Sequence, residues 1–144
     1  MGDPDPLDVA ARALRARDRS RRDVEERLAR AGVDVQTRAE TLETLERLGY
    51  VDDRRFARSR AEVLARRGYG DEWIRGDLAE HGVDPDVAAD AMAGLEPEGE
   101  RASALVARLG PSARTASRLV GKGFAAEAVE AALESGWREA SPEL

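Results

Sequence analysis

The chain has 144 residues, of which 29 are acidic and 23 are lysine or arginine, with a net charge of −6 and no cysteine. This length suits one ordinary domain or an array of small modules. The negative charge argues against a protein that binds mainly by neutralising phosphates, and the lack of cysteine excludes disulfides and thiolate metal ligands.

Nine amphipathic segments follow one another, and none shows the two-residue alternation of a β-strand. They predict helices over residues 7–18, 20–31, 35–48, 52–67, 71–81, 85–93, 97–109, 111–122 and 126–135. Each of these segments except the first is followed by a glycine, the usual stop signal: Gly32, Gly49, Gly68, Gly82, Gly94, Gly110, Gly123 and Gly136. Start signals agree, with a capping-box spacing at Ser20 and Asp23 and acidic-proline pairs at Asp5-Pro6, Asp84-Pro85 and Glu96-Pro97. We therefore predict an all-α protein.

Five positions recur in register around Gly32, Gly82 and Gly123. Eighteen residues before each glycine lies a leucine, eight before a β-branched residue, four before another leucine, and one after an apolar residue. In chain order these are Leu14, Val24, Leu28 and Val33, then Leu64, Ile74, Leu78 and Val83, then Leu105, Thr115, Leu119 and Phe124. The positions eight and four before the glycine share one helix face, so we expect them to point into a module.

This repeat predicts three tandem three-helix modules over residues 7–49, 50–95 and 96–136, with a flexible N-terminus (1–6) and a C-terminal tail (137–144). Such units stack into an elongated array whose extended surface suits binding better than catalysis. No apolar run reaches the roughly 20 residues of a membrane span, and the acidic N-terminus is unlike a signal peptide. We expect a cytoplasmic protein without membrane contact.

The segment from Gly49 to Ala57 contains two adjacent carboxylates, Asp52 and Asp53. Neighbouring helical residues point about 100° apart, so these groups would not converge on one metal ion. We expect Asp52 to cap a helix and Asp53 to lie in its first turn, where carboxylates offset the helix dipole. Three apolar residues of the segment are expected to pack in the core between modules one and two: Tyr50, Val51 and Phe56.

No set of residues indicates catalysis. His81 is the only histidine and is expected at a helix C-terminus, so neither a transition-metal site nor a Ser-His-Asp triad is predicted. Gly121-Lys122-Gly123 lacks the spacing of a phosphate-binding loop. We expect no enzyme activity and no cofactor.

Arginines gather in the leading segments of modules one and two, whereas acids gather at helix starts and third helices. Each arginine alone fits a solvated helix face, but together they favour a binding stripe for acidic protein surfaces or phosphates. Arg12, Arg15 and Arg19 have helical spacing and are expected to share a face. Trp73 fits either an interface anchor or module packing, and Tyr69 is expected to project from a short connection. The candidate binding residues are Arg12, Arg15, Arg19, Arg22, Arg54, Arg55, Arg58, Arg66, Arg67, Tyr69 and Trp73.

These motifs, in this order, resemble those of the RecX family of regulators of the RecA recombinase. The matching stretches are Ser20 to Leu28, Gly49 to Ala57, Arg67 to Gly70 with Ile74, Leu78, Gly82 and Val83, and Leu119, Gly123 and Phe124. The resemblance implies three three-helix modules, curved overall, that lie along the groove of a RecA filament on single-stranded DNA. It also implies that the protein hinders ATP hydrolysis and strand exchange by RecA, or promotes filament disassembly.

A DNA-binding protein of the helix-turn-helix kind is the alternative, because arginine-rich three-helix modules resemble such domains. The acidic net charge and the lack of one plainly base-reading helix argue against it. Weak nonspecific DNA binding is compatible with both hypotheses, and we expect a monomer.

Overall fold

The computed structural model describes residues 2–141, which contain nine α-helices and no strand. The helices are α1 (Pro6–Ala16), α2 (Arg21–Arg30), α3 (Val35–Arg47), α4 (Asp53–Arg66), α5 (Asp71–Glu80), α6 (Pro85–Ala93), α7 (Glu98–Leu109), α8 (Ala113–Gly121) and α9 (Ala126–Ala140). The all-α prediction is confirmed.

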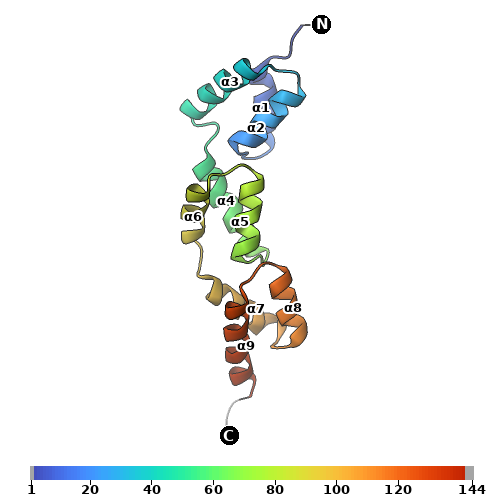
Figure 1. Cartoon of the computed structure of the whole chain (residues 1–144), viewed down its shortest axis with the longest axis vertical. Coiled ribbons are helices and arrows are strands. Elements are labelled where there is room, and N and C mark those ends of the chain that lie inside the picture. The colour runs from blue at the N-terminus through green and yellow to red at the C-terminus, as the bar shows by residue number, and fades with distance from the viewer. Residues whose placement is uncertain (1, 142–144) are drawn as a thin grey trace.

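The helices form three consecutive triplets along the long axis of the molecule, and the middle triplet is offset from the outer two, which gives a shallow curve (Figure 1). Each triplet encloses a separate apolar core, one around Val24 and Leu28, one around Ile74 and Leu78, and one around Leu119. The predicted elongated array of three-helix modules is therefore confirmed.

The repeated positions are the centres of these cores. Both residues of each pair before the glycine are buried in every module, including Thr115, which stands where the other copies have Val24 and Ile74. Thr115 is accommodated because its hydroxyl lies 3.2 Å from that of Ser112, which also accepts the Thr115 amide hydrogen. The leading leucines differ more, since Leu64 is buried while Leu14 and Leu105 are partly exposed.

Most of the predicted start and stop signals lie at the ends of helices in the structure. Ser20 and Asp23 form a complete capping box, and the Asp52 carboxylate accepts the Arg55 amide hydrogen at the start of α4. The three anchor glycines Gly32, Gly82 and Gly123 have φ between 75° and 93°, a region that side-chain-bearing residues rarely adopt. Pro97 is an N-cap instead of the expected first helical residue.

Gly136 was expected to end the last helix, but α9 continues through it to Ala140. A Cβ at Gly136 would lie 2.6 Å from Cγ1 of Val106, so this glycine serves a close approach between α7 and α9. Residues 137–140 are therefore helical, and residues 142–144 of the expected tail lie outside the described residues. At the other end α1 already begins at Pro6, capped by Asp5, and Met1 also lies outside the described residues.

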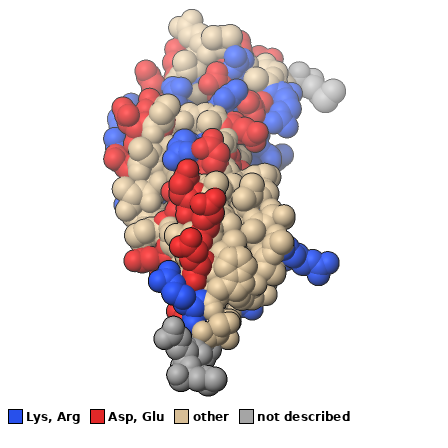
Figure 2. Space-filling view, turned by 60° about the horizontal axis from the view of Figure 1, so that its bottom comes forward, with Lys and Arg blue, Asp and Glu red and all other residues tan. Residues whose placement is uncertain are grey.

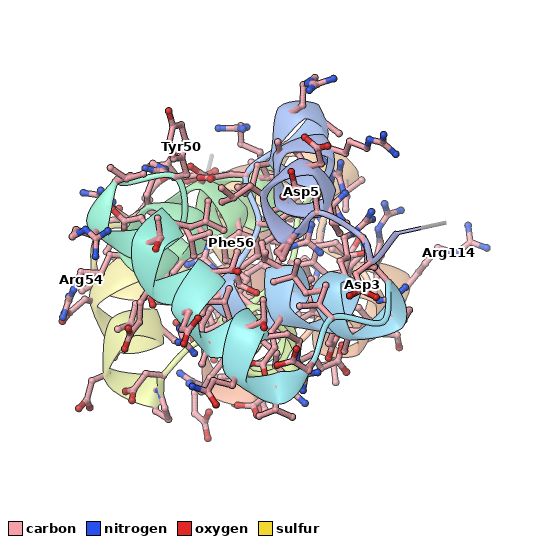
Figure 3. All side chains as sticks on the ribbon, turned by 90° about the horizontal axis from the view of Figure 1, so that it is seen from above. Asp3, Asp5, Tyr50, Arg54, Phe56 and Arg114 are labelled. Atoms are coloured by element: carbon pink, nitrogen blue, oxygen red, sulfur yellow. The ribbon has the colours of Figure 1, made fainter. Side chains whose placement is uncertain are left out.

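The segment at the start of module two is divided between environments. Val51 packs in the first core and Phe56 in the second, so neither lies between the modules as expected. Tyr50 is 60% exposed, and its predicted burial is wrong. It stands in the turn after α3 and points outward, as does Arg54, whereas Phe56 points inward (Figure 3).

Consecutive modules meet through equivalent helix ends. At the junction of modules one and two, the last turn of α5 lies against the start of α2, where the Ser20 hydroxyl donates to the His81 carbonyl at 2.7 Å. At the next junction the last turn of α8 lies against the start of α5, where the Gly70 amide donates to the Lys122 carbonyl at 2.8 Å. Ser20 and Gly70 are the N-caps of α2 and α5, so the same contact recurs with different chemistry.

Candidate partner-binding surface

The arginines of module one do not form the predicted three-residue stripe. Arg12 and Arg15 are exposed on α1. Arg19 lies beyond the end of that helix and is 8% exposed, and its Nε donates to the Ala13 carbonyl at 2.8 Å. Burial lowers the pKa of its guanidinium, with smaller contributions from neighbouring arginines. Its placement on the α1 face was wrong, because the chain leaves the helix at Arg17 in an extended conformation.

Two arginines at the start of α4 are held by carboxylates. Arg55 makes a two-pronged contact with Asp18 of module one, at 3.0 and 3.1 Å, and this bond raises the pKa of the guanidinium. Arg54 contacts Asp90 at 3.1 Å, although both groups are well exposed, so this pair contributes little. Arg55 thus links modules one and two through an ion pair, and Arg54 remains accessible.

Four further candidates lie on the surface. Arg58, Arg66 and Arg67 are exposed on α4 and at its C-cap, and no ion pair is found for them among the described residues. Arg22 is exposed, lies 3.5 Å from Glu26, and extends its aliphatic part over Gly82 of module two. These positions do supply accessible positive charge on modules one and two.

The two aromatic candidates lie together. The rings of Tyr69 and Trp73 stack with centroids 4.8 Å apart, and the Lys122 ammonium lies 4.1 Å from the Tyr69 centroid. Tyr69 is half-buried by these contacts and does not project freely, whereas Trp73 is 47% exposed. Lys122 belongs to this aromatic cluster but was not among the predicted binding residues, because Tyr69 is 53 positions away in the sequence.

The family can be decided by comparison with known proteins. The regulatory protein RecX of Acidithiobacillus ferrooxidans is 32% identical over 136 residues, which cover 92% of this chain and 91% of that protein. The regulatory protein RecX of Chromohalobacter salexigens is 34% identical over 141 residues, which cover 92% of this chain and 93% of that one. The chain belongs to the RecX family. A family model described as the second three-helix domain of RecX also matches residues 52–92.

Solved structures agree on the fold of this RecX-family chain. The crystal structure of RecX from Lactobacillus salivarius superposes with a TM-score of 0.78, at 20% identity, over 90% of this chain and 93% of that one. A second crystal structure of a regulatory protein RecX gives a TM-score of 0.74 at 20% identity, over 87% and 71% of the two chains. The array of three modules is therefore a fold found in solved RecX structures.

Acidic side chains gather elsewhere on this RecX-family chain. Glu127, Glu130 and Glu134 have helical spacing and are exposed on α9. Figure 2 shows a column of acidic side chains on the face seen from the end of module three. The exposed arginines of α1 and α4 thus contrast with an acidic face on α9, while α8 of module three carries the exposed Arg114 and Arg118. The three-and-four spacing of these glutamates was a signal that the sequence reasoning did not use.

The single histidine of this RecX-family chain, His81, contacts a carboxylate of the neighbouring module. His81 Nδ1 lies 2.9 and 3.0 Å from the two carboxylate oxygens of Asp23. The nearby Ser20 hydroxyl is fully buried and donates to a backbone carbonyl, so it is no nucleophile paired with that imidazole. Within residues 2–141 no group of three or more histidine or carboxylate side chains is placed to hold a metal ion. None of the helices in that range is long and apolar enough to cross a membrane.

Proposed function

We propose that this RecX-family chain binds the RecA recombinase filament on single-stranded DNA and inhibits its ATPase and strand-exchange activities. It would thereby modulate recombination, DNA repair and the SOS response in the cytoplasm, as a monomeric regulator without catalytic activity of its own. The observation that carries the proposal is relatedness to RecX regulatory proteins over more than nine-tenths of the chain. The long array of modules supports it, because such a shape offers an extended surface to a filament.

The distribution of charge supports contacts through modules one and two. Arg12 and Arg15 on α1 and Arg58 on α4 are exposed, and no ion pair holds them among the described residues. Free guanidinium groups pair readily with carboxylates and phosphates, both of which a nucleoprotein filament presents. The chain's overall negative charge makes naked DNA a poorer partner than a surface that combines protein and DNA.

The direct test follows ATP hydrolysis and strand exchange by RecA on single-stranded DNA as the chain is added. We expect both activities to fall as the chain approaches stoichiometric levels. No effect on either would refute the proposed function. In parallel, binding to DNA without RecA should be weak, and tight DNA binding with a steep salt dependence or sequence-specific footprints would instead favour the helix-turn-helix alternative.

Charge reversal tests the arginine surface. The variant Arg12→Glu with Arg15→Glu should raise the concentration needed for half-inhibition by at least tenfold, because two favourable contacts become repulsive. Arg114→Glu with Arg118→Glu on α8 is the matched control, since both arginines are exposed and the change in net charge is equal. Circular dichroism should show unchanged helicity for both. Inhibition by the Arg12→Glu, Arg15→Glu variant equal to that by the original chain would show that these arginines are only a solvent-exposed helix face.

A further inference from the structure

A pocket of 320 Å³ lies between α5 and α8, where modules two and three meet. Its apolar wall is formed by Trp73 and Val120, both of which are about half exposed. Its lining also includes Gly76 of α5 and Gly121 of α8. The pocket therefore combines accessible indole surface with bare backbone.

The fold does not require glycine at Gly76. This residue lies inside α5, its φ is not positive, and a Cβ there would meet nothing within 4 Å. Glycine inside a helix is less favourable than alanine, so this position gives up stability without a gain in packing. A missing side chain in a pocket lets a ligand approach the backbone closely.

The aromatic surface of the pocket suits a cation. Tyr69 covers part of the Trp73 ring system and is itself approached by the Lys122 ammonium. The rest of the indole is left open, and a cation over an indole is the strongest pairing of this kind. The stack thus already holds one cation and has a free aromatic surface for another.

The charges around the pocket select the same class of ligand. Glu72 and Glu80 are exposed on its rim, and Asp77 lies deeper, bonded to Arg60 at 2.7 and 2.8 Å. Glu72 contacts Arg75 at 2.9 Å, but both side chains are more than half exposed, so this pair yields readily to a competitor. Glu80 makes no ion pair within residues 2–141. The charge of Asp77 is already paired with Arg60, so Glu72 and Glu80 are the carboxylates that attract a cationic side chain and repel a phosphate.

We propose that this pocket binds an arginine or lysine side chain of the recombinase, stacked on Trp73 and paired with Glu72 or Glu80. This inference rests on the proposed function for the identity of the partner. It assigns Trp73 to contact with protein, while the arginines of modules one and two remain available to acidic groups or phosphates. The pocket and the arginine surface would then recognise opposite charges on one partner.

The sharpest variant fills the pocket without harming the fold. Gly76→Leu places a side chain in open space on α5 and improves its helix propensity, so the thermal midpoint should not fall. The concentration for half-inhibition of RecA on single-stranded DNA should rise at least tenfold. Gly99→Leu is the matched control, because Gly99 is also an exposed helical glycine with nothing within 4 Å of a Cβ, and it does not line the pocket. Its inhibition should equal that of the original chain.

A second measurement is independent of RecA. The chain has two tryptophans, so the Trp137→Phe variant reports on Trp73 alone by its fluorescence. Titration with a hexa-arginine peptide should change this emission, and a hexa-glutamate peptide should not. Adding Gly76→Leu, or Glu72→Gln with Glu80→Gln, should weaken the response to hexa-arginine at least fivefold.

The outcomes separate the two proposals. If the original chain does not inhibit RecA but hexa-arginine still binds at Trp73, the proposed function fails and the cation pocket stands with another partner. If the original chain inhibits and Gly76→Leu inhibits within twofold of it, the pocket is not used and the inference fails. Weaker binding of Gly76→Leu to single-stranded DNA alone would also overturn the inference, because the pocket would then contact nucleic acid.

Discussion

The two junctions between modules share one geometry and differ in the groups that build it. In both, the first residue of the next module's first helix carries a carboxylate. This carboxylate accepts the backbone N–H of the first residue in the second helix of the preceding module. Asp53 accepts from Arg21 at 2.8 Å, and Glu98 accepts from Asp71 at 2.7 Å. The difference lies in the turn beside it, where the first junction uses the side chains of Ser20 and Asp23, and the second uses backbone contacts.

The backbone contacts at the second junction bring modules two and three closer together than the side-chain contacts bring modules one and two. At the second junction the Gly70 and Glu72 amides donate to the carbonyls of Lys122 and Gly123, and a Cβ on Gly70 would strike the backbone at Gly123. At the first junction the Arg22 side chain, which can move, covers Gly82. We infer that the second junction is the more rigid of the two, because main-chain contacts do not relax by rotamer changes. The pocket beside Trp73 thus lies at the more rigid of the two junctions.

The largest expected effect comes from replacing the three anchor glycines by alanine. Gly32→Ala meets nothing and should cost about 1–2 kcal/mol for its positive φ alone. Gly82→Ala should cost slightly more, because Arg22 must move aside. Gly123→Ala brings a Cβ to 2.6 Å from the Trp73 amide nitrogen, which adds about 1–3 kcal/mol of overpacking.

Urea unfolding of the full chain measures this series, with hydrogen exchange at residues 69–73 as a local readout. The predicted order of destabilisation is Gly123→Ala, then Gly82→Ala, then Gly32→Ala. If Gly82→Ala and Gly123→Ala cost the same, the two junctions do not differ in rigidity as we infer.

The sequence was sufficient to predict the helices and their buried faces, but it was insufficient to predict the contacts at the junctions between modules. The buried pairs such as Val24 and Leu28 were predictable because their periodicity is local, and the repeat confirmed their register. Contacts between modules were not, because Ser20 and His81 are far apart in the chain and nothing in either residue indicates the other. Their chemistry is decided only when two helix ends meet in space.

The errors at the candidate surface have identifiable causes. Arg19 immediately precedes Ser20, which was correctly predicted as an N-cap. The helix predicted over residues 7–18 already ended before Arg19, and an N-cap requires a non-helical approach, so both observations could have excluded Arg19 from the face of Arg12 and Arg15. Tyr50 was placed in the core on hydrophobicity alone, although it directly follows Gly49, a residue with φ of 81° in an exposed turn. The misplacement of Gly136 had no local signal, since only the approach of α7 explains it.

A smaller effect is expected from Glu98→Gln at the second junction. The two carboxylate oxygens of Glu98 accept the Asp71 and Ala125 amides at 2.7 and 3.0 Å, so one residue joins α5 to the start of α9. Glutamine retains one acceptor and turns an NH₂ group toward the other donor. We expect a loss of about 1–3 kcal/mol in the free energy of unfolding. Faster hydrogen exchange at either amide is the local measurement, and an unchanged midpoint with unchanged exchange would contradict the assigned role.

The smallest effect is expected from Asp53→Asn at the first junction, and it depends on pH. Burial raises the pKa of the Asp53 carboxyl above its usual value of 3.8, and nearby Glu46 adds to the rise. The folded chain therefore holds this proton more tightly than the unfolded chain, so stability is lost as pH rises from below 3.8 through the raised pKa. Asparagine keeps an acceptor for the Arg21 amide and removes that loss.

We therefore expect Asp53→Asn to be at least as stable as the original chain at pH 7, whereas Glu98→Gln is destabilised there. The advantage of Asp53→Asn should shrink as the pH falls toward 3.8, because the protonated carboxyl then resembles the amide. Thermal midpoints between pH 3 and 7 measure the difference. A variant that is less stable than the original chain at pH 7, by an amount that grows with pH, would mean that the charged carboxylate stabilises the first junction.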